Sequence, residues 1–435
     1  MITLRPVWLH HLSGRTVAAI GCAVSGLVAL GAPACGAASS TPRPAAGASA
    51  RTAPPAATSA STPATVQVVA SGLNQPKKIS VAPNGSLLVA LSGTGASPVS
   101  CTDNVQPSCL GQSGAIDEIS PSGQVTTVVG NLPSVSSSHS SQEATGPAEA
   151  RMIGGKLQVL FQDYGINFGT GRQPYGPGGA LLGDLVRMSA SGGSRHVEAS
   201  FGPFEATHNP DHDKGTDVTR HQEPGVDSDP YSFVPYRGGY AVADAGGNDL
   251  LFLPRRGAIR LLAVFPTITE RAAPGSYGTS QTRTITAQAQ AVPDSVAVGP
   301  DGALYVGELG GTPFDVGTSS VYRVVPGHAP TVYARGFTSI ADLAFDNHGR
   351  LLVLEIDQKG LSDPALQGSG PPSPGAIVRV GADRKHTVIA SDGLEFPTGM
   401  AVTRSGVIYV SNDGITDANP GLPGSGGELV RVSPG

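Results

Sequence analysis

The chain has 435 residues, of which 39% are hydrophobic and 14% are charged, and its formal net charge is −5. A mildly acidic chain without a basic stripe does not fit nucleic-acid binding. The 59 glycines and 37 prolines suit many short strands and turns, and no segment shows a sustained 3.6-residue period. We therefore expect an all-β protein with essentially no helix in its folded domain.

Residues 1–35 have the pattern of an export signal. Two arginines precede an apolar stretch, residues 16–32, which is too short and too rich in glycine to span a membrane comfortably. Small residues before Cys35 leave two alternatives: lipidation of Cys35, as in bacterial lipoproteins, or release by ordinary signal peptidase. Both predict a secreted or cell-surface protein, attached to the membrane only through a lipid on Cys35. Residues 36–64, rich in Ala, Ser, Thr and Pro, are expected to form a disordered tether.

Residues 65–435 repeat one unit six times. Its clearest copy, residues 293–308 (PDSVAVGPDGALYVGE), alternates apolar residues on both sides of a Gly-Pro-Asp-Gly turn, which is the pattern of a β-hairpin. The other copies start at Pro76, Pro147, Pro230, Ile340 and Pro397, and the turn glycines are Gly85, Gly155, Gly239, Gly302, Gly349 and Gly406. This recurrence predicts a repeat architecture.

A third strand follows each hairpin, and a fourth follows in all copies but the last. Third strands are expected at residues 114–119, 183–188, 248–253, 320–325, 375–380 and 427–432, and fourth strands at 124–129, 194–199, 258–264, 330–334 and 385–390. Four-stranded antiparallel units repeated radially form a β-propeller, which removes long exposed edges. Residues 65–70 (TVQVVA) resemble the missing fourth strand. We predict a monomeric six-bladed propeller, closed by pairing of this N-terminal strand into the last blade.

The long connections between strands are expected to cluster at the two mouths of the ring, where function usually lies. Cys101 and Cys109 share a first-blade loop, and in an exported protein they predict a local disulfide, with two free thiols as the alternative. Residues 131–145 are Ser-rich and expected to be mobile. Residues 209–217 (NPDHDKGTD) lack the glycine and glutamate positions of an EF-hand, so an exposed polar loop is expected there.

Carboxylates recur near one mouth of the predicted channel. They end second strands (Asp244, Glu308, Glu355) or lie near the start of first strands (Glu149, Asp294, Asp342). Side chains from several blades could converge there on Ca²⁺ or another divalent cation, which oxygen ligands favour. The candidate metal ligands are Asp244, Asn248, Glu308, Asp342 and Glu149. The sharpest local signal is ADAGGNDL, residues 243–250, where Asp249 could also contribute; the alternative is a set of solvated rim residues or turn-forming side chains.

Familiar catalytic motifs are missing from the sequence. It contains no nucleophile elbow, no metalloprotease helix, no P-loop and no dinucleotide-binding fingerprint between a strand and a helix. These absences still leave open a site assembled from several blades.

Four stretches together resemble the ScyD/ScyE family of exported bacterial propellers: ADAGGNDLL, VPDSVAVGPDGALYVGELGGTPFDVG, FPTGMAVTRSGVIYVSNDG and NPDHD…DSDPYSF. The resemblance covers about residues 66–432, and Asp229 stands where the family more often has Asn. It implies a six-bladed propeller of the NHL and SMP-30/gluconolactonase type and supplies no settled activity. In SMP-30-like lactonases a divalent ion is held by Glu, Asn and Asp at the channel mouth. Glu149, Asn248 and Asp244 could play such parts, although their order does not match that family's motif.

Two functions are therefore expected. The first is a non-catalytic binding or scaffold protein at the cell surface or outside the cell, which uses one propeller mouth for a ligand or protein of unknown identity. The second is a metal-dependent hydrolase or lactonase with a carboxylate/Asn cluster at the channel mouth. Convergence of Asp244, Asn248, Glu308 and Asp342 on one point would favour the second function. Acids that point into solvent would favour the first.

Overall fold

The computed structural model of the chain describes residues 64–95, 108–137, 140–162, 175–189, 193–212, 227–272, 284–361, 373–415 and 426–434. All of these belong to one compact unit. The expected signal sequence, Cys35, Cys101 and nearly all of the tether lie outside the described residues, so these assignments stay predictions. Within the described ranges, no helix is long and apolar enough to cross a membrane.

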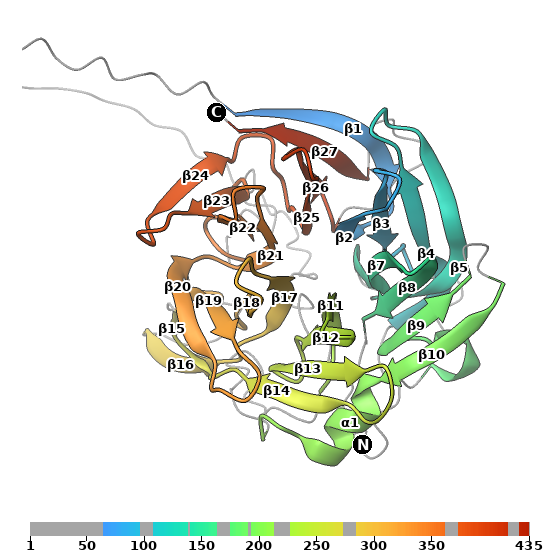
Figure 1. The fold of residues 1–435 in the computed structure, drawn as a ribbon, viewed down its shortest axis with the longest axis horizontal. Coiled ribbons are helices and arrows are strands. Elements are labelled where there is room, and N and C mark those ends of the chain that lie inside the picture. The colour runs from blue at the N-terminus through green and yellow to red at the C-terminus, as the bar shows by residue number, and fades with distance from the viewer. Residues whose placement is uncertain are drawn as a thin grey trace, which may run out of the picture. The chain divides into compact units, whose positions relative to one another are not determined.

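Six antiparallel sheets form a six-bladed β-propeller around a central axis, as predicted (Figure 1). Blade one contains β2 (Pro76–Val81), β3 (Leu87–Leu91), β4 (Ser108–Ile119) and β5 (Val125–Ser137). Blade two contains β7 (Pro147–Ile153), β8 (Lys156–Phe161), β9 (Asp184–Met188) and β10 (Arg195–Ser200). Blade three contains β11 (Pro230–Tyr236), β12 (Gly239–Asp244), β13 (Asp249–Pro254) and β14 (Arg260–Val264).

The C-terminal half of the chain supplies the other three blades. Blade four contains β17 (Pro293–Val298), β18 (Leu304–Glu308), β19 (Ser319–Val324) and β20 (Thr331–Phe337). Blade five contains β21 (Ile340–Phe345), β22 (Leu351–Glu355), β23 (Ala376–Val380) and β24 (His386–Ala390). Blade six contains β25 (Gly399–Val402), β26 (Ile408–Asn412) and β27 (Gly427–Ser433), together with the N-terminal β1 (Thr65–Leu73). The first strand of each blade lies nearest the axis (Figure 1).

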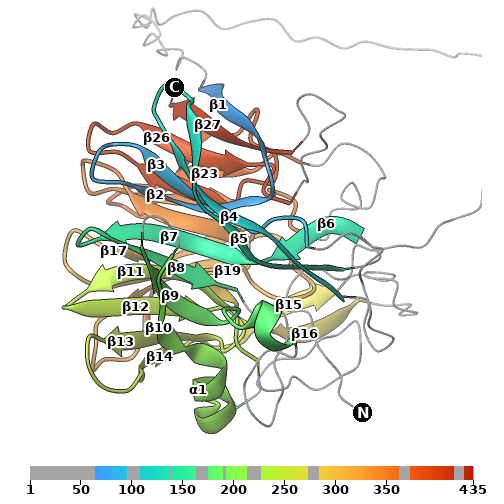
Figure 2. The same cartoon turned by 90° about the vertical axis from the view of Figure 1, so that its right-hand side faces the viewer.

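The N-terminal strand closes the ring. β1 pairs antiparallel with β27, from Thr65 opposite Ser433 to Leu73 opposite Gly427. In the side view the two strands run next to each other (Figure 2). This pairing confirms the predicted closure, in which the start of the propeller supplies the fourth strand of the last blade.

Blade three shows how the blades pack. Because side chains alternate along a strand, each sheet presents one apolar set to each neighbouring blade. Val242 and Leu251 face blade two, where they join a core cluster with Leu160 and Leu185. Ala243 and its neighbours on the other face join residues of blade four. A polar residue in one of the inner strands can therefore be buried between two blades on either face of the sheet.

The hairpin turns depend on glycines in the left-handed region. Gly302, in the turn of the blade-four hairpin, has φ +75°, a conformation that favours glycine even though space is available there. In blade three the positive φ falls on Gly238 (+80°) and not on the predicted Gly239. Gly239 is needed for another reason, since a Cβ there would collide with the carbonyl oxygen of Leu253.

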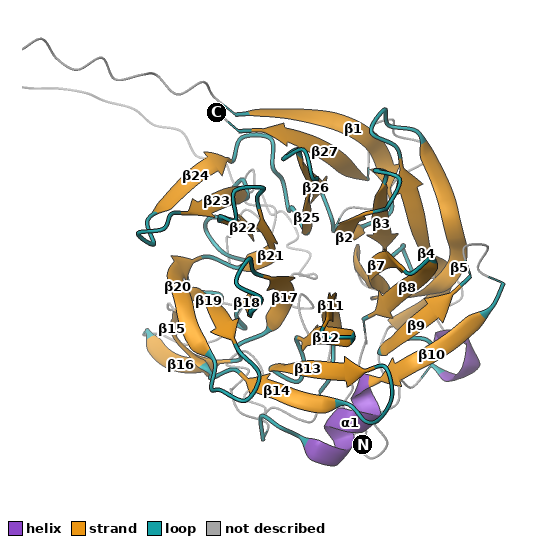
Figure 3. Ribbon diagram, in the orientation of Figure 1, coloured by secondary structure: helices purple, strands orange, loops and turns teal. Residues whose placement is uncertain are grey.

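Five short elements stand where loops were expected, and the two helical ones are purple in Figure 3. The fold is nearly all β, as predicted, and α1 (Phe201–His208) and a short 3-10 helix η2 (Gly176–Gly179) are local exceptions to the expectation of essentially no helix. An eight-residue helix that contains Gly and Pro is too short and too poor in helix formers to show a period. β15 (Ile268–Ala272) and β16 (Ile285–Ala289) form an added hairpin, and β6 (Ser140–Thr145) extends blade one within the Ser-rich stretch.

Candidate functional site

Polar side chains near the start of the inner strands meet in the central channel. We call Lys78, Glu149, Ser232, Asp294 and Asp342 the channel belt; they come from β2, β7, β11, β17 and β21. All five strands have a register irregularity at this level; in blade four, for example, the pairing passes from Pro293 to Ser295 and skips Asp294. Such bulges re-aim side chains, which explains how residues of several blades reach a common level.

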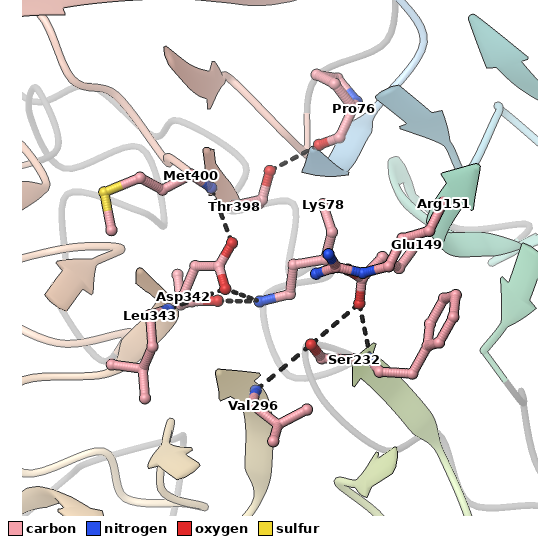
Figure 4. Close-up of polar contacts among 12 residues, drawn as sticks. Pro76, Lys78, Glu149, Arg151, Ser232, Val296, Asp342, Leu343, Thr398 and Met400 are labelled. Atoms are coloured by element: carbon pink, nitrogen blue, oxygen red, sulfur yellow. Dashed lines mark hydrogen bonds and ion pairs between the residues drawn. The ribbon is translucent and has the colours of Figure 1, made fainter. Parts of the chain in front are cut away.

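Lys78 spans the channel from blade one to blade five (Figure 4). Its ammonium group donates to the carbonyl oxygen of Ala341 and lies 3.5 Å from Asp342 Oδ1. The same group lies 5.2 Å from the ring centre of Tyr231 in blade three. The Lys78 side chain is only 1% exposed. Because a buried ammonium is costly without partners, these contacts are what makes the position tolerable.

Glu149 and Asp342 each reach the backbone of the next blade. Glu149 is paired with Arg151, and its Oε2 accepts hydrogen bonds from Ser232 Oγ at 3.0 Å and from the Phe233 N–H at 2.7 Å. Asp342 Oδ2 accepts a hydrogen bond from the Met400 N–H at 2.8 Å. Burial raises the pKa of Glu149, while Arg151 and the Phe233 N–H lower it. Both carboxylates therefore already have protein donors.

Asp294 is the least satisfied member of the channel belt. It is 2% exposed, and its Oδ1 has no hydrogen-bond partner among the described residues. Burial raises the pKa of Asp294 well above the usual range; the Lys78 ammonium lowers it and the Asp342 carboxylate raises it. A buried carboxyl with a raised pKa close to an ammonium group is a candidate acid–base group.

A second group of acids lies beside blade three. We call Glu205, Asp211, Asp244 and Asp249 the blade-three acidic cluster. Asp244 and Asp249 are directly opposite each other on β12 and β13, so their side chains project from the same face of the sheet. The strand alternation places them on the face that also carries Val242.

α1 brings Glu205 to this face. Phe201, at the start of α1, packs in the same core cluster as Val242 and Leu251. Glu205 follows Phe201 by one helical turn and is buried like it, so it lies on the same side of the helix. A Cβ at Gly247, in the turn between β12 and β13, would lie 3.2 Å from Glu205 Oε2 and 3.4 Å from Asp244 Cγ. The turn glycine thus makes room between two carboxylates.

Hydrogen bonds fix Asp244 and Asp211. Asp244 accepts from Ser228 Oγ at 2.7 Å, the Asp229 N–H at 2.6 Å and the Gly247 N–H at 3.1 Å. Asn248, at φ +52°, donates from Nδ2 to Asp211 Oδ2 at 2.8 Å. Its Oδ1 accepts from the Val292 N–H at 3.0 Å. Asn248 therefore orients Asp211.

Asp249 has no such support. Its side chain is fully buried, and neither carboxylate oxygen has a hydrogen-bond partner within the part of the chain that the structure describes. Burial raises the pKa of Asp249 well above its usual range, and the charges of Asp244, Glu205 and Asp211 raise it further. The negative charges of the other three acids thus disfavour the ionised form of Asp249.

Glu308 lies apart from both groups, in blade four. Burial raises the pKa of Glu308 well above the usual range, the Ser320 N–H and the Tyr322 hydroxyl lower it, and Glu270 raises it further. Burial also raises the pKa of Glu270, on β15, to about 7, while donors from Asp315 and Thr318 lower it.

The five predicted metal ligands thus divide among three places. Glu149 and Asp342 lie in the channel belt, Asp244 and Asn248 in blade three, and Glu308 in blade four. No three His, Cys, Asp or Glu side chains of the described ranges form a ready metal-binding group. Cys109 is buried on β4, and because Cys101 lies outside the described residues, the disulfide stays a prediction.

Sequence reasoning missed four residues that complete these groups: Lys78, Ser232, Glu205 and Asp211. Lys78 and Ser232 occupy the third position of the repeat, where the other copies carry Glu, Ser, Asp or Gly, and this polar position was the only sequence signal for them. Glu205 lies on the unexpected helix α1. Asp211 was expected in an exposed polar loop but is 5% exposed, because the Asn248 amide holds it against blade three.

Comparisons with known proteins find solved structures of similar fold but do not assign the chain to a family. No family model and no curated protein matches the chain. A gluconolactonase from Xanthomonas campestris matches with 9% identity and a TM-score of 0.47 over 86% of this chain and 90% of that chain. Regucalcin, a calcium-binding protein from Agrobacterium tumefaciens, matches with 10% identity and a TM-score of 0.46 over 86% and 94%. A putative glucose dehydrogenase from Thermus thermophilus matches with 17% identity and a TM-score of 0.46 over 85% and 100%. Likenesses this distant decide nothing about activity, and the propeller assignment rests on the blades themselves.

Proposed function

We propose that the chain is a hydrolase of lactones or simple esters with its reaction centre in the channel belt. The observation that carries the proposal is the Asp294 carboxyl, which is buried near the Lys78 ammonium with one oxygen unpartnered among the described residues. Ligand and active sites of many folds are found where a few polar groups converge in an otherwise apolar setting. The ScyD/ScyE resemblance stays an expectation and supplies no reaction.

In the proposed reaction Asp294 acts as the general base. It takes a proton from a water molecule, whose oxygen forms a bond to the carbonyl carbon of the lactone. The negative charge that develops on the carbonyl oxygen is stabilised by the Lys78 ammonium. When the ring C–O bond breaks, Asp294 returns its proton to the departing oxygen. One water is consumed and a hydroxy acid is formed, so no other reactant is needed.

The channel belt does not fit the divalent cation that a metal-dependent hydrolase would need. Such a cation would polarise the carbonyl as a Lewis acid. In the belt, however, Lys78 already lies against Asp342, and Arg151 already pairs with Glu149. A second positive charge beside these groups would be repelled, so no step of the proposed reaction uses a cation there.

The test is a screen of the purified full chain against γ- and δ-lactones and p-nitrophenyl esters. Asp294→Asn should lower kcat by ~10²–10⁴, as expected when a general base is lost. Asp301→Asn, at the turn of the same hairpin and away from the channel, should leave kcat unchanged. Because the base must be ionised, the wild-type rate should fall as pH falls through the raised pKa of Asp294. Turnover that Asp294→Asn does not reduce would contradict the proposal.

A non-catalytic binding or scaffold protein is the second candidate function. It is favoured by the burial of Lys78 and Glu149, each 1% exposed, and by their contacts with other blades. Groups engaged in this way hold the ring together and need no substrate. This candidate requires that the wild type hydrolyse none of the substrates in the screen, and measurable turnover would exclude it as the main function.

A further inference from the structure

We propose that the blade-three acidic cluster binds one divalent cation of the Ca²⁺ class, which links α1 to the turn between β12 and β13. The inference stands on the geometry of blade three and is independent of whether the chain is a hydrolase. The site lies outside the channel belt and draws on residues from two segments, 201–212 and 244–249.

The four carboxylates of the cluster point into the same region. Asp244 and Asp249 project from one face of the sheet because they are a directly opposed pair. Glu205 approaches the same face from α1, whose Phe201 packs there. Asp211 is brought in by its hydrogen bond to Asn248. Four carboxylates that come from a helix, the segment after it and two strands therefore share one interior region.

The negative charge at Asp249 is not balanced by the described residues around it. Among the described residues, every charge that acts on Asp249 is negative and comes from the other three acids of the cluster. Both oxygens of Asp249 are buried without a hydrogen-bond partner in those same ranges. A buried carboxylate is stable only if it is paired, hydrogen-bonded or bound to a metal. Within the described residues, hydrogen-bond donors reach Asp244 and Asp211 but not Asp249.

The turn between β12 and β13 is shaped for close approach of the carboxylates. Gly246 leaves no room for a side chain, because a Cβ would collide with the backbone of Ser228. Gly247 lies between Glu205 and Asp244, and Asn248 holds a left-handed conformation with both ends of its amide engaged. These features bring the carboxylates near one another at a cost in repulsion that a cation would remove.

The chemistry of the donors selects the kind of ion. Carboxylate oxygens without Cys or His favour a hard cation over Zn²⁺. Ca²⁺ accepts six to eight oxygens in flexible geometry, whereas Mg²⁺ keeps several waters and demands an octahedron. The four acids do not yet form a ready coordination group, so binding is expected to draw Glu205 and Asp249 inward.

The experiment measures bound metal and thermal stability of the full chain, with no activity readout. After dialysis against Ca²⁺ and removal of free ion, elemental analysis should find one Ca²⁺ per chain. EDTA should lower the melting temperature by roughly 5–10 °C, and added Ca²⁺ should restore it. Mg²⁺ at the same concentration should restore less.

Asp249→Asn should bind Ca²⁺ at least ~10-fold more weakly and lose its response to EDTA. Asp117→Asn is the matched control, because Asp117 is also buried with an unpartnered oxygen but has no acid among the causes of its raised pKa. It should keep the full response to EDTA. If Asp249→Asn does not fold, Glu205→Gln on α1 should give the same loss of Ca²⁺. A chain without stoichiometric metal, or a Ca²⁺ response that neither cluster variant changes, would overturn the proposal.

Discussion

The channel belt and the blade-three acidic cluster bury carboxylates in opposite ways. In the belt, Glu149 meets Arg151 and a backbone N–H of the next blade, and Asp342 meets Lys78 and another N–H. In the cluster, Asp249 meets only other acids in the part of the chain that is described. Since buried charge must be compensated, Glu149 and Asp342 are satisfied by protein groups, whereas Asp249 has no compensating partner among the described residues.

Removing the Lys78 ammonium group from the channel belt is expected to cause the largest loss of stability. Lys78→Met would leave Asp342 buried without its ammonium partner, which should cost about 3–5 kcal/mol of unfolding free energy. Urea denaturation of the full chain measures this loss. Lys385→Met is the control, because its ion pair with Asp383 is on the surface and should contribute nothing measurable. A loss below about 1 kcal/mol would show that the channel does not depend on Lys78.

A smaller loss of stability is expected when Glu149, which accepts hydrogen bonds from blade three, is replaced. Glu149→Ala leaves the Phe233 N–H and the Ser232 hydroxyl without their acceptor, which should cost about 2–3 kcal/mol. Glu149→Gln keeps an acceptor oxygen and should cost about half as much. Denaturation of both variants separates hydrogen bonding from charge. Equal losses would mean that the negative charge, and not the acceptor, joins blades two and three.

Glu355 is a buried acid outside both groups and has no neighbouring charge among the described residues. Burial raises the pKa of Glu355 to about 7, while the Thr338 N–H lowers it. The native state then holds a proton that the unfolded chain releases at about pH 4.3, so stability should fall as pH rises from about 4.3 to 7. Glu355→Gln keeps an acceptor for Thr338 and removes this loss. At pH 8 the variant should be more stable than the wild type by about 1–3 kcal/mol, and near pH 4 the two should be equal. Unfolding measured from pH 4 to 8 tests this, and a constant difference across that range would contradict it.

The blades were predictable because their signals are local. Alternating apolar residues and turn glycines mark each hairpin, and a count of strands was enough to assign residues 65–70 to the last blade. The sequence also placed Asp294 and Asp342 near the start of inner strands. Their partners were not predictable, because Lys78 meets Ala341 across 263 positions of the chain. Which acids share a space depends on bulges and on side-chain direction, and neither has a sequence signature.

The blade-three acidic cluster shows more clearly that the sequence does not reveal which side chains meet. The run from Asp244 to Asp249 was recognisable as a candidate site from its two glycines and three polar residues. Glu205 was not, since it lies on a helix whose eight residues include Gly and Pro. A short helix is stabilised by the core it packs on, here through Phe201, and so its presence depends on the finished fold.

The most direct test of the contrast between the two regions is anomalous diffraction from crystals of the protein grown with Mn²⁺, a hard divalent cation that carboxylates bind. We expect one strong peak bounded by Glu205, Asp244 and Asp249, and none beside Lys78. A peak next to Lys78 and Asp342, or a blade-three cluster without any peak, would contradict this expectation.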